Sequence, residues 1–290
     1  MKLYAPKYYR DFSCIADRCS HSCCIGWEID VDDATMEKYD LITHPYGENI
    51  RKSIEDGHFR LAKHDRCPHL DERGLCRIIC ELGEDCLCDI CREHPRFYNY
   101  TSRGCFVGLG LSCEEACRII LTSDNYADFE VIGEVDGDSE ENFDAISEIE
   151  KLYAILSDRN RTYSERISLI ASAHSLPSDF SADYRREILS SLEYLEEEHK
   201  NLFLVAKNAT FNTENAIFER ALAYFIFRHC SAALDECEFR AALGFSLFCE
   251  NLLRALAAEN EDIHDLARII SEELEYSEDN SESIKTEFMF

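Results

Sequence analysis

The sequence predicts a mainly α-helical fold in two parts. The first is a cysteine-rich metal-binding module with a few short strands, and the second is an acidic helical domain. Thirteen of the sixteen cysteines lie between Cys14 and Cys117. After residue 142, apolar residues recur at helical spacing almost throughout. The predicted limits are 1–130 for the cysteine-rich iron–sulfur module, 131–142 for a linker, 143–275 for the acidic helical domain and 276–290 for a tail.

Short helices and strands are expected in the first half of the module. Asp32 or Asp33 can cap a helix over residues 34–40, because a carboxylate accepts hydrogen bonds from the first turn. Residues 59–75 are expected to form a strand–turn–strand unit. Its turn is the polar segment Asp71–Gly74.

The second half of the module contains clearer signals. Residues 77–93 are expected to be helical with an interruption at Gly83. Residues 97–107 are rich in aromatic and β-branched residues, which predicts a strand or hairpin. The pattern Ser112–Glu115 is that of a capping box, so a helix should begin there.

Amphipathic and buried helices are expected throughout the acidic domain, and its last residues are expected to fray. Residues 276–290 form this tail, although Phe288-Met289-Phe290 could dock on the core. The expected helices are a stripe from Ile146 to Leu156, Arg166 to Ala173 behind a capping box at Thr162, one long helix from Arg185 to Ala206, a buried helix from Ala216 to Arg228, and helices from Phe239 to Ala258 and from Ile263 to Leu274.

The net charge of −28 is concentrated in the second part of the chain. Residues 1–125 hold 16 Lys and Arg against 22 Asp and Glu, whereas the remaining residues hold 14 against 36. This acidity argues against nucleic-acid binding, which requires clustered basic residues. No apolar run approaches the roughly 18 residues of a membrane span, and the N-terminal residues lack a secretory signal. We therefore expect a cytoplasmic protein without membrane contact.

Cysteines at this density suggest disulfides, zinc or an iron–sulfur cluster. Thiols stay reduced in the cytoplasm, which disfavours disulfides. A zinc ribbon needs two C-x-x-C knuckles, and only Cys88-Asp-Ile-Cys91 has that form. Consecutive C-x-x-C steps, as in bacterial ferredoxins, are also missing. The spacings alone therefore leave zinc and iron–sulfur open.

Several ordered blocks between about residues 4 and 120 resemble the flagellin lysine-N-methylase family. That family is related to cysteine-cluster proteins described as zinc- or iron-chelating. The blocks include Lys7-Tyr-Tyr-Arg-Asp-Phe12, Cys23-Cys24-x-Gly26-Trp27, Asp71-Glu-x-Gly-Leu75-Cys76, Cys91-Arg92-x-x-Pro95-Arg96 and Leu111-Ser112-Cys113. The acidic helical half is compatible with the family but carries no matching motif.

The resemblance implies methyl transfer from S-adenosylmethionine to lysine side chains of flagellin, by an enzyme with a cysteine-bound [4Fe–4S] cluster. One such cluster takes four thiolates. The family pattern supplies eight, so either a subset binds it or a second metal is present. These eight metal-ligand candidates are Cys14, Cys19, Cys23, Cys24, Cys67, Cys76, Cys91 and Cys113.

Three residues near these cysteines are candidate cofactor contacts. Trp27 is expected to shield the metal from water. Arg92 and Arg96 are expected to hydrogen-bond cluster sulfurs or a bound carboxylate, with ordinary ion pairs as the alternative. His69 is one of four histidines beside cysteines that could be ligands or second-layer groups, and Gly104-x3-Gly108-x-Gly110 is a weak nucleotide-loop pattern.

The sequence thus predicts an S-adenosylmethionine-dependent protein-lysine N-methyltransferase whose partner is flagellin or another lysine-rich protein. The acidic half would attract such a substrate. No residue is identified as the general base. The alternative is a non-enzymatic module that binds Zn²⁺ or iron and offers a helical docking surface. A third possibility is an iron–sulfur electron carrier.

Overall fold

The computed structural model describes residues 1–137, 143–210, 216–260 and 262–289. The chain packs as two units. The small unit is Ser13–Arg96, and the large unit combines Met1–Phe12 with Phe97–Phe290. The predicted module of residues 1–130 contributes to both units, because the strand over residues 2–6 pairs with the strands over residues 104–109 and 129–134 in the large unit. The predicted domain limits stay a prediction.

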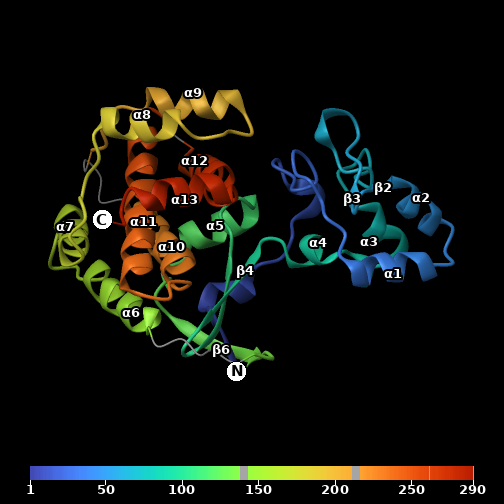
Figure 1. The fold of residues 1–290 in the computed structure, drawn as a ribbon, viewed down its shortest axis with the longest axis horizontal. Coiled ribbons are helices and arrows are strands. Elements are labelled where there is room, and N and C mark those ends of the chain that lie inside the picture. The colour runs from blue at the N-terminus through green and yellow to red at the C-terminus, as the bar shows by residue number, and fades with distance from the viewer. Residues whose placement is uncertain (138–142, 211–215, 261, 290) are drawn as a thin grey trace. The chain divides into compact units, whose positions relative to one another are not determined.

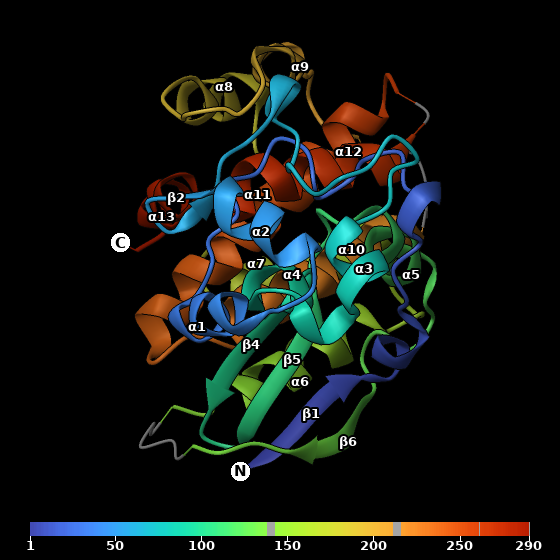
Figure 2. The same cartoon turned by 90° about the vertical axis from the view of Figure 1, so that its right-hand side faces the viewer.

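A four-stranded sheet forms one side of the large unit, in the order β4-β5-β1-β6 (Figure 2). Its strands are β1 (Lys2–Pro6), β4 (Arg96–Thr101), β5 (Gly104–Leu109) and β6 (Phe129–Glu134). Strand β1 runs parallel to β5 and antiparallel to β6. The strand or hairpin predicted over residues 97–107 is confirmed. Gly104 is required where β5 begins, because a Cβ there would lie 2.6 Å from the Lys2 carbonyl oxygen.

Helices make up most of the large unit, and α10 and α11 pack together at its centre (Figure 1). The mainly helical fold is thus confirmed. None of the helices within the described ranges combines the length and the apolar composition that crossing a bilayer requires. The helices are α5 (Glu114–Thr122), α6 (Ala145–Leu156), α7 (Tyr163–Ala173), α8 (Ala182–Ser190), α9 (Glu197–Val205), α10 (Ala216–Phe225), α11 (Glu236–Ala257), α12 (Ile263–Ile270) and α13 (Glu278–Thr286).

The single long helix predicted from Arg185 to Ala206 is wrong, because the chain breaks between α8 and α9. The buried carboxylate of Glu273 lies at this break. It accepts hydrogen bonds from the backbone amides of Leu195 at 2.8 Å and Glu196 at 3.2 Å, and it contacts His199 Nδ1 at 2.7 Å. These amides lie just before α9, whose N-cap residue is Glu196, so an acid from a distant segment replaces the hydrogen bonds that a continuous helix would have made.

Removing the Glu273 carboxylate should destabilise the protein strongly. In Glu273→Ala, two backbone amides and the His199 ring lose a buried acceptor, so we expect the free energy of unfolding to fall by about 3 kcal/mol. Urea unfolding measures this. Glu278→Ala is the matched control, because Glu278 is exposed on α13 and its loss should cost less than about 0.5 kcal/mol. Equal effects of the two substitutions would contradict the capping role.

The end of the chain is also more ordered than predicted. Residues expected to fray form α13, and Phe288 is buried. Phe288 packs so closely on α11 that a Cβ at Gly244 would lie 2.3 Å from its ring. The predicted docking is therefore confirmed for Phe288, whereas Phe290 lies outside the described residues.

The two predicted capping boxes have different outcomes. Thr162 and Glu165 form one at the start of α7, as predicted. The pattern at Ser112 does not, because α5 has Cys113 as its N-cap residue and no capping hydrogen bond from that side chain. Ser112 lies one position too early to bond the third amide of the helix.

Short elements surround the core of the small unit. The N-cap at Asp32 is confirmed, since its carboxylate accepts from the Thr35 amide at 2.9 Å. The strand–turn–strand unit predicted over residues 59–75 is wrong in extent. Around the turn at Asp71–Gly74, the strands are reduced to an isolated bridge between Leu70 and Cys76. The named elements are α1 (Asp33–Leu41), α2 (Tyr46–Ser53), β2 (Ile54–Glu55), β3 (His58–Phe59), α3 (Arg77–Leu82) and α4 (Asp89–Glu93).

Candidate metal centre

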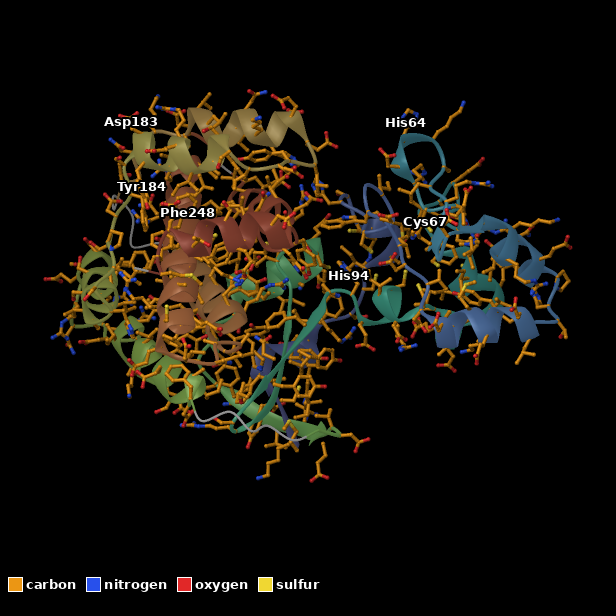
Figure 3. All side chains as sticks on the ribbon, in the orientation of Figure 1. His64, Cys67, His94, Asp183, Tyr184 and Phe248 are labelled. Carbon is orange, nitrogen blue, oxygen red and sulfur yellow. The ribbon has the colours of Figure 1, made fainter. Side chains whose placement is uncertain are left out.

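Thiols form a large part of the core of the small unit. Cys67 and Cys88 are buried there together with aliphatic and aromatic side chains. Cys24, Cys76 and Cys91 pack against the same core, and Cys86 also contacts it. Figure 3 labels Cys67 among the short elements of this unit. The protein interior here therefore contains several soft sulfur donors at close range.

The backbone brings these cysteines together from separate segments. The Cys67 amide donates to the Cys24 carbonyl at 2.8 Å, which joins the first segment to the second. Cys76 and Cys88 occupy the same position on different helices: they are the N-cap residues of α3 and α4. Cys91 follows Cys88 within α4, so both thiols of the C-x-x-C motif belong to one helical turn.

The thiols influence one another electrostatically. A hydrogen bond between their side chains lowers the pKa of Cys88 and raises that of Cys91, with burial adding to the rise at Cys91. A hydrogen bond from Cys23 is the main cause that lowers the pKa of Cys24 to about 7. Burial raises the pKa of Cys67 to about 12, and the nearby thiols of this core add to that rise. Such mutual effects require short distances between the groups.

The chemistry of these donors fits a soft, thiolate-bound metal. No disulfide joins any of the sixteen cysteines, all of which lie in the described part of the chain. In the same part of the chain, no group of three or more Cys, His, Asp or Glu side chains is arranged to hold a metal ion. Metal binding would therefore require side-chain rotation to bring three or four sulfurs onto one centre.

The other predicted ligands are not part of this core, although Cys23 bonds to Cys24 at its edge. Cys14 and Cys23 are exposed and Cys19 is half-buried, all in the N-terminal segment of the small unit. Cys113 belongs to the large unit, as the N-cap of α5. Six cysteines make up what we call the thiol core of the small unit: Cys24, Cys67, Cys76, Cys86, Cys88 and Cys91. The family pattern omits Cys88, which is only 1% exposed there. Its spacing from Cys91 in the C-x-x-C motif was the signal that could have added it.

The predicted cofactor contacts are placed as follows. Trp27 is half-buried. The exposed guanidinium of Arg92 pairs with Asp89 and Glu93, the ion-pair alternative weighed from the sequence. Arg96 donates weakly to the Arg92 carbonyl, at 3.4 Å. Their contact with a cofactor stays a prediction.

His69 serves the interior of the small unit instead of binding a metal in this arrangement. Its Nδ1 lies 2.8 Å from Tyr46 Oη and its Nε2 lies 2.9 Å from Ser53 Oγ, so both ring nitrogens are occupied. Ser53 Oγ itself donates to the Ile50 carbonyl, which makes Nε2 the protonated nitrogen. Burial lowers the pKa of His69 to about 4, and the ring is therefore neutral.

The glycine pattern before α5 has a packing explanation. A Cβ at Gly108 would lie 2.3 Å from the ring of Phe97 and 2.9 Å from that of Phe227. Glycine is needed there so that two aromatic rings can lie against β5.

Comparison with known proteins adds a second, independent observation. The flagellar biosynthetic protein FliU of Salmonella muenchen is 31% identical over 129 residues, which is 40% of this chain and 75% of FliU. The chain belongs to the flagellin lysine-N-methylase family. The resemblance inferred from the cysteine blocks is thereby confirmed.

Two further members of the flagellin lysine-N-methylase family are enzymes by name. The lysine-N-methylases of Salmonella typhimurium and Salmonella choleraesuis are each 30% identical over 40% of this chain. The match spans only 31% of the length of each. No family model matches the chain, and no solved structure matches it.

Proposed function

We propose that this protein is a lysine N-methyltransferase that acts on flagellin or a similar lysine-bearing protein. The observation that carries the proposal is the match to FliU and to two lysine-N-methylases. The methyl donor we propose is S-adenosylmethionine, and the metal is a [4Fe–4S] cluster bound by cysteines of the small unit. The thiol core supports the metal part, because it gathers sulfur donors from separate segments.

The reaction places one chemical demand on the protein. The ε-nitrogen of lysine attacks the methyl carbon, the bond from that carbon to the donor sulfur breaks, and S-adenosylhomocysteine leaves. The lysine ammonium must first lose a proton to a nearby base, since only the neutral amine carries a nucleophilic electron pair. When bound, an iron–sulfur cluster can supply an iron site that contacts the methyl donor or can hold the surrounding fold together.

The charge of the chain suits this substrate class. With a net charge of −28, it attracts basic protein surfaces over distances set by the ionic strength. We expect methylation of a lysine-rich substrate to slow as salt is raised. Initial rates at increasing salt concentration measure this effect, and a salt-independent rate would remove steering by charge from the proposal.

Mass spectrometry tests the activity directly. Flagellin is incubated anaerobically with the iron–sulfide-loaded protein and S-adenosylmethionine, and lysine peptides are searched for the mass of added methyl groups. Reactions without the methyl donor and without the protein are the controls. No mass gain would overturn the proposed activity.

The alternative function is a metal-binding module without catalysis. A purified protein that is colourless and contains stoichiometric zinc would favour this alternative. A brown protein that absorbs at about 400 nm would favour the cluster.

A further inference from the structure

Helix α1 and its N-cap residue hold the C-x-x-C motif of the small unit through hydrogen bonds on both sides of Cys88. Before the motif, Tyr39 Oη donates to the Cys86 carbonyl at 2.8 Å. Directly after Cys88, the Asp89 amide donates to Asp32 Oδ2 at 2.9 Å. The backbone on each side of the Cys88 thiol is therefore tied to the same helix.

The two residues that make these bonds are themselves firmly placed. The Tyr39 side chain belongs to the core of the small unit and is 1% exposed. The Asp32 carboxylate serves two helices at once. Its Oδ1 accepts from the Thr35 amide of α1 at 2.9 Å, while its Oδ2 accepts from Asp89, the first residue of α4. The starts of α1 and α4 therefore cannot separate without breaking a bond to this carboxylate.

The Asp32 carboxylate also lies within electrostatic range of the motif. The hydrogen bond with Cys91 lowers the pKa of Cys88, whereas the charge of Asp32 acts in the opposite direction. A fixed negative charge beside thiolates attracts a bound metal cation and disfavours an added electron. Asp32 can therefore act on a metal in two ways, through the backbone that it holds and through its charge.

We propose that Asp32 and Tyr39 are positioning residues that fix the backbone of the C-x-x-C turn, so that Cys88 and Cys91 reach one metal by rotation of their side chains. A backbone that is ordered beforehand lowers the entropy lost when the metal binds. That the metal is an iron–sulfur cluster rests on the proposed function, whereas the fixing of the turn does not.

Asp32→Asn separates the two bonds of this carboxylate. Asparagine caps helices as well as aspartate does, so the bond from the Thr35 amide is kept. The amide nitrogen that replaces Oδ2 is a donor, and it cannot accept from the Asp89 amide. Asp33→Asn is the matched control, because it removes the same charge from the neighbouring residue, which is exposed.

Tyr39→Phe removes the hydroxyl that holds the Cys86 carbonyl. Its matched control is Tyr46→Phe, which removes another buried hydroxyl of the small unit, 2.8 Å from His69 Nδ1. Both substitutions take one hydrogen bond from the same core, but only Tyr39 bonds to the segment that leads into the motif.

Zinc is the probe for metal binding, because it needs no cluster assembly. Competition with a chromophoric chelator measures the affinity of the reduced, metal-free, full-length protein for Zn²⁺. We expect this affinity to fall about 10- to 100-fold in Asp32→Asn, as for other residues that orient metal ligands. In Tyr39→Phe it should fall about fivefold, the effect of one lost neutral hydrogen bond. Both controls should bind zinc as the wild type does.

The reduction potential of the loaded cluster separates positioning from general destabilisation. A residue that only supports the fold changes the fraction of protein that holds a cluster, but it leaves the potential of that cluster unchanged. We expect Asp32→Asn to raise the potential, because it removes a negative charge beside the thiolates, and Asp33→Asn to raise it less. Should Tyr39→Phe not fold, the comparison of Asp32→Asn with Asp33→Asn decides the proposal.

Wild-type zinc affinity in Asp32→Asn and Tyr39→Phe would overturn the proposal, as would equal losses in their controls. Weaker zinc binding without a shift in potential supports the fixed turn and removes the effect of the Asp32 charge. A wild-type protein that binds zinc but neither holds a cluster nor methylates flagellin removes the proposed function, and the zinc comparison still decides the positioning role. A wild-type protein that binds neither metal overturns both.

Discussion

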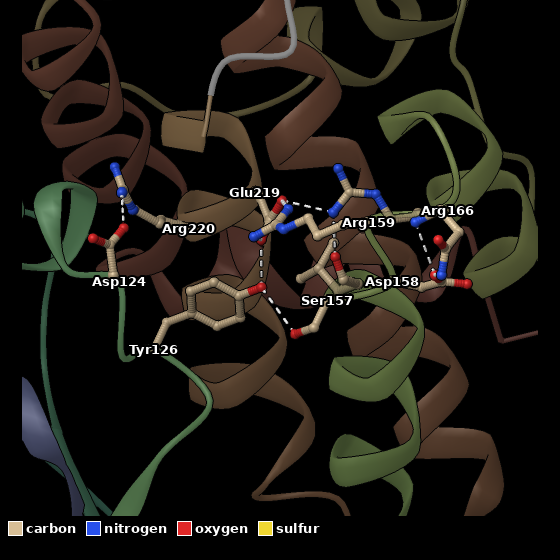
Figure 4. A network of polar contacts seen from close by, with 10 residues as sticks. Asp124, Tyr126, Ser157, Asp158, Arg159, Arg166, Glu219 and Arg220 are labelled. Atoms are coloured by element: carbon tan, nitrogen blue, oxygen red, sulfur yellow. Dashed lines mark hydrogen bonds and ion pairs between the residues drawn. The ribbon is translucent and has the colours of Figure 1, made fainter.

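Replacing Glu219 with alanine should lower the free energy of unfolding by about 3 to 5 kcal/mol, because it leaves a buried charge without its partner. Glu219 belongs to α10 and its side chain is 3% exposed. It accepts from Arg166 Nη1 at 2.7 Å, from Arg159 Nη2 at 2.7 Å and from Tyr126 Oη (Figure 4). The Arg166 side chain is only 7% exposed, so water cannot replace the lost carboxylate.

The same interactions make the contribution of Glu219 depend on pH. Burial raises the pKa of its carboxyl, but the bonds from Arg159, Tyr126 and Arg166 outweigh burial and hold the pKa below 4.5. The unfolded state therefore binds its proton first as the pH falls. The contribution of Glu219 to stability is complete above pH 4.5 and is lost as the pH falls through the folded pKa. Urea unfolding of wild type and Glu219→Ala across this range measures the difference.

Asp124→Ala is the control for this network. Asp124 pairs with Arg220, which is on the same helix as Glu219, but the Asp124 side chain is 87% exposed. Exposed ion pairs contribute about 0 to 1 kcal/mol, because water screens them. A loss of stability in Glu219→Ala no larger than in Asp124→Ala would contradict the burial argument.

Features of this fold that depend on neighbouring residues could be predicted from the sequence. The apolar stripe over residues 146–156 lies on α6 and is buried, because period and burial are set within one helix. Asp32 and Thr162 cap helices as predicted, since a cap needs only the next few amides. The interruption at Gly83, with φ of +93°, follows from glycine itself.

Features that depend on distant residues could not be predicted. The break between α8 and α9 is stabilised by Glu273, which is more than 70 residues further along the chain. The π-helical turns Ile226–Cys230 and Ser271–Glu275 likewise depend on contacts such as that between His229 and Glu275. For the site, the motif blocks were enough to indicate the family, because order and spacing are sequence properties. Which thiols share one core depended on the tertiary fold, although the C-x-x-C spacing already placed Cys88 beside Cys91.

Replacing Cys67 or Cys91 with alanine should remove most of the bound iron and sulfide, and with it any methyl transfer. Both residues match the family pattern and belong to the thiol core of the small unit. Residues that merely support a ligand change metal affinity about 10- to 100-fold, so the loss of a ligand should cost at least that much. The loss is measured by iron and sulfide analysis of the anaerobically loaded variants and by their absorbance at about 400 nm.

Two other cysteines separate metal binding from packing. Cys105 is as well buried as Cys67 but lies on β5 of the large unit, so Cys105→Ala controls for the loss of a buried thiol. Cys80 is exposed on α3 and lies outside the family pattern, so Cys80→Ala should keep its iron.

Cys88→Ala tests whether the family pattern or the packing of the thiols better identifies the cysteines that bind the metal. Cys88 is absent from the pattern but shares the thiol core with Cys67 and contacts Cys91. We expect it to lose iron as Cys91→Ala does. Full retention of iron in Cys88→Ala would mean that the C-x-x-C pair does not act as a unit. In that case the cluster would draw its ligands from the family cysteines, Cys91 included, and the burial of Cys88 would reflect packing alone.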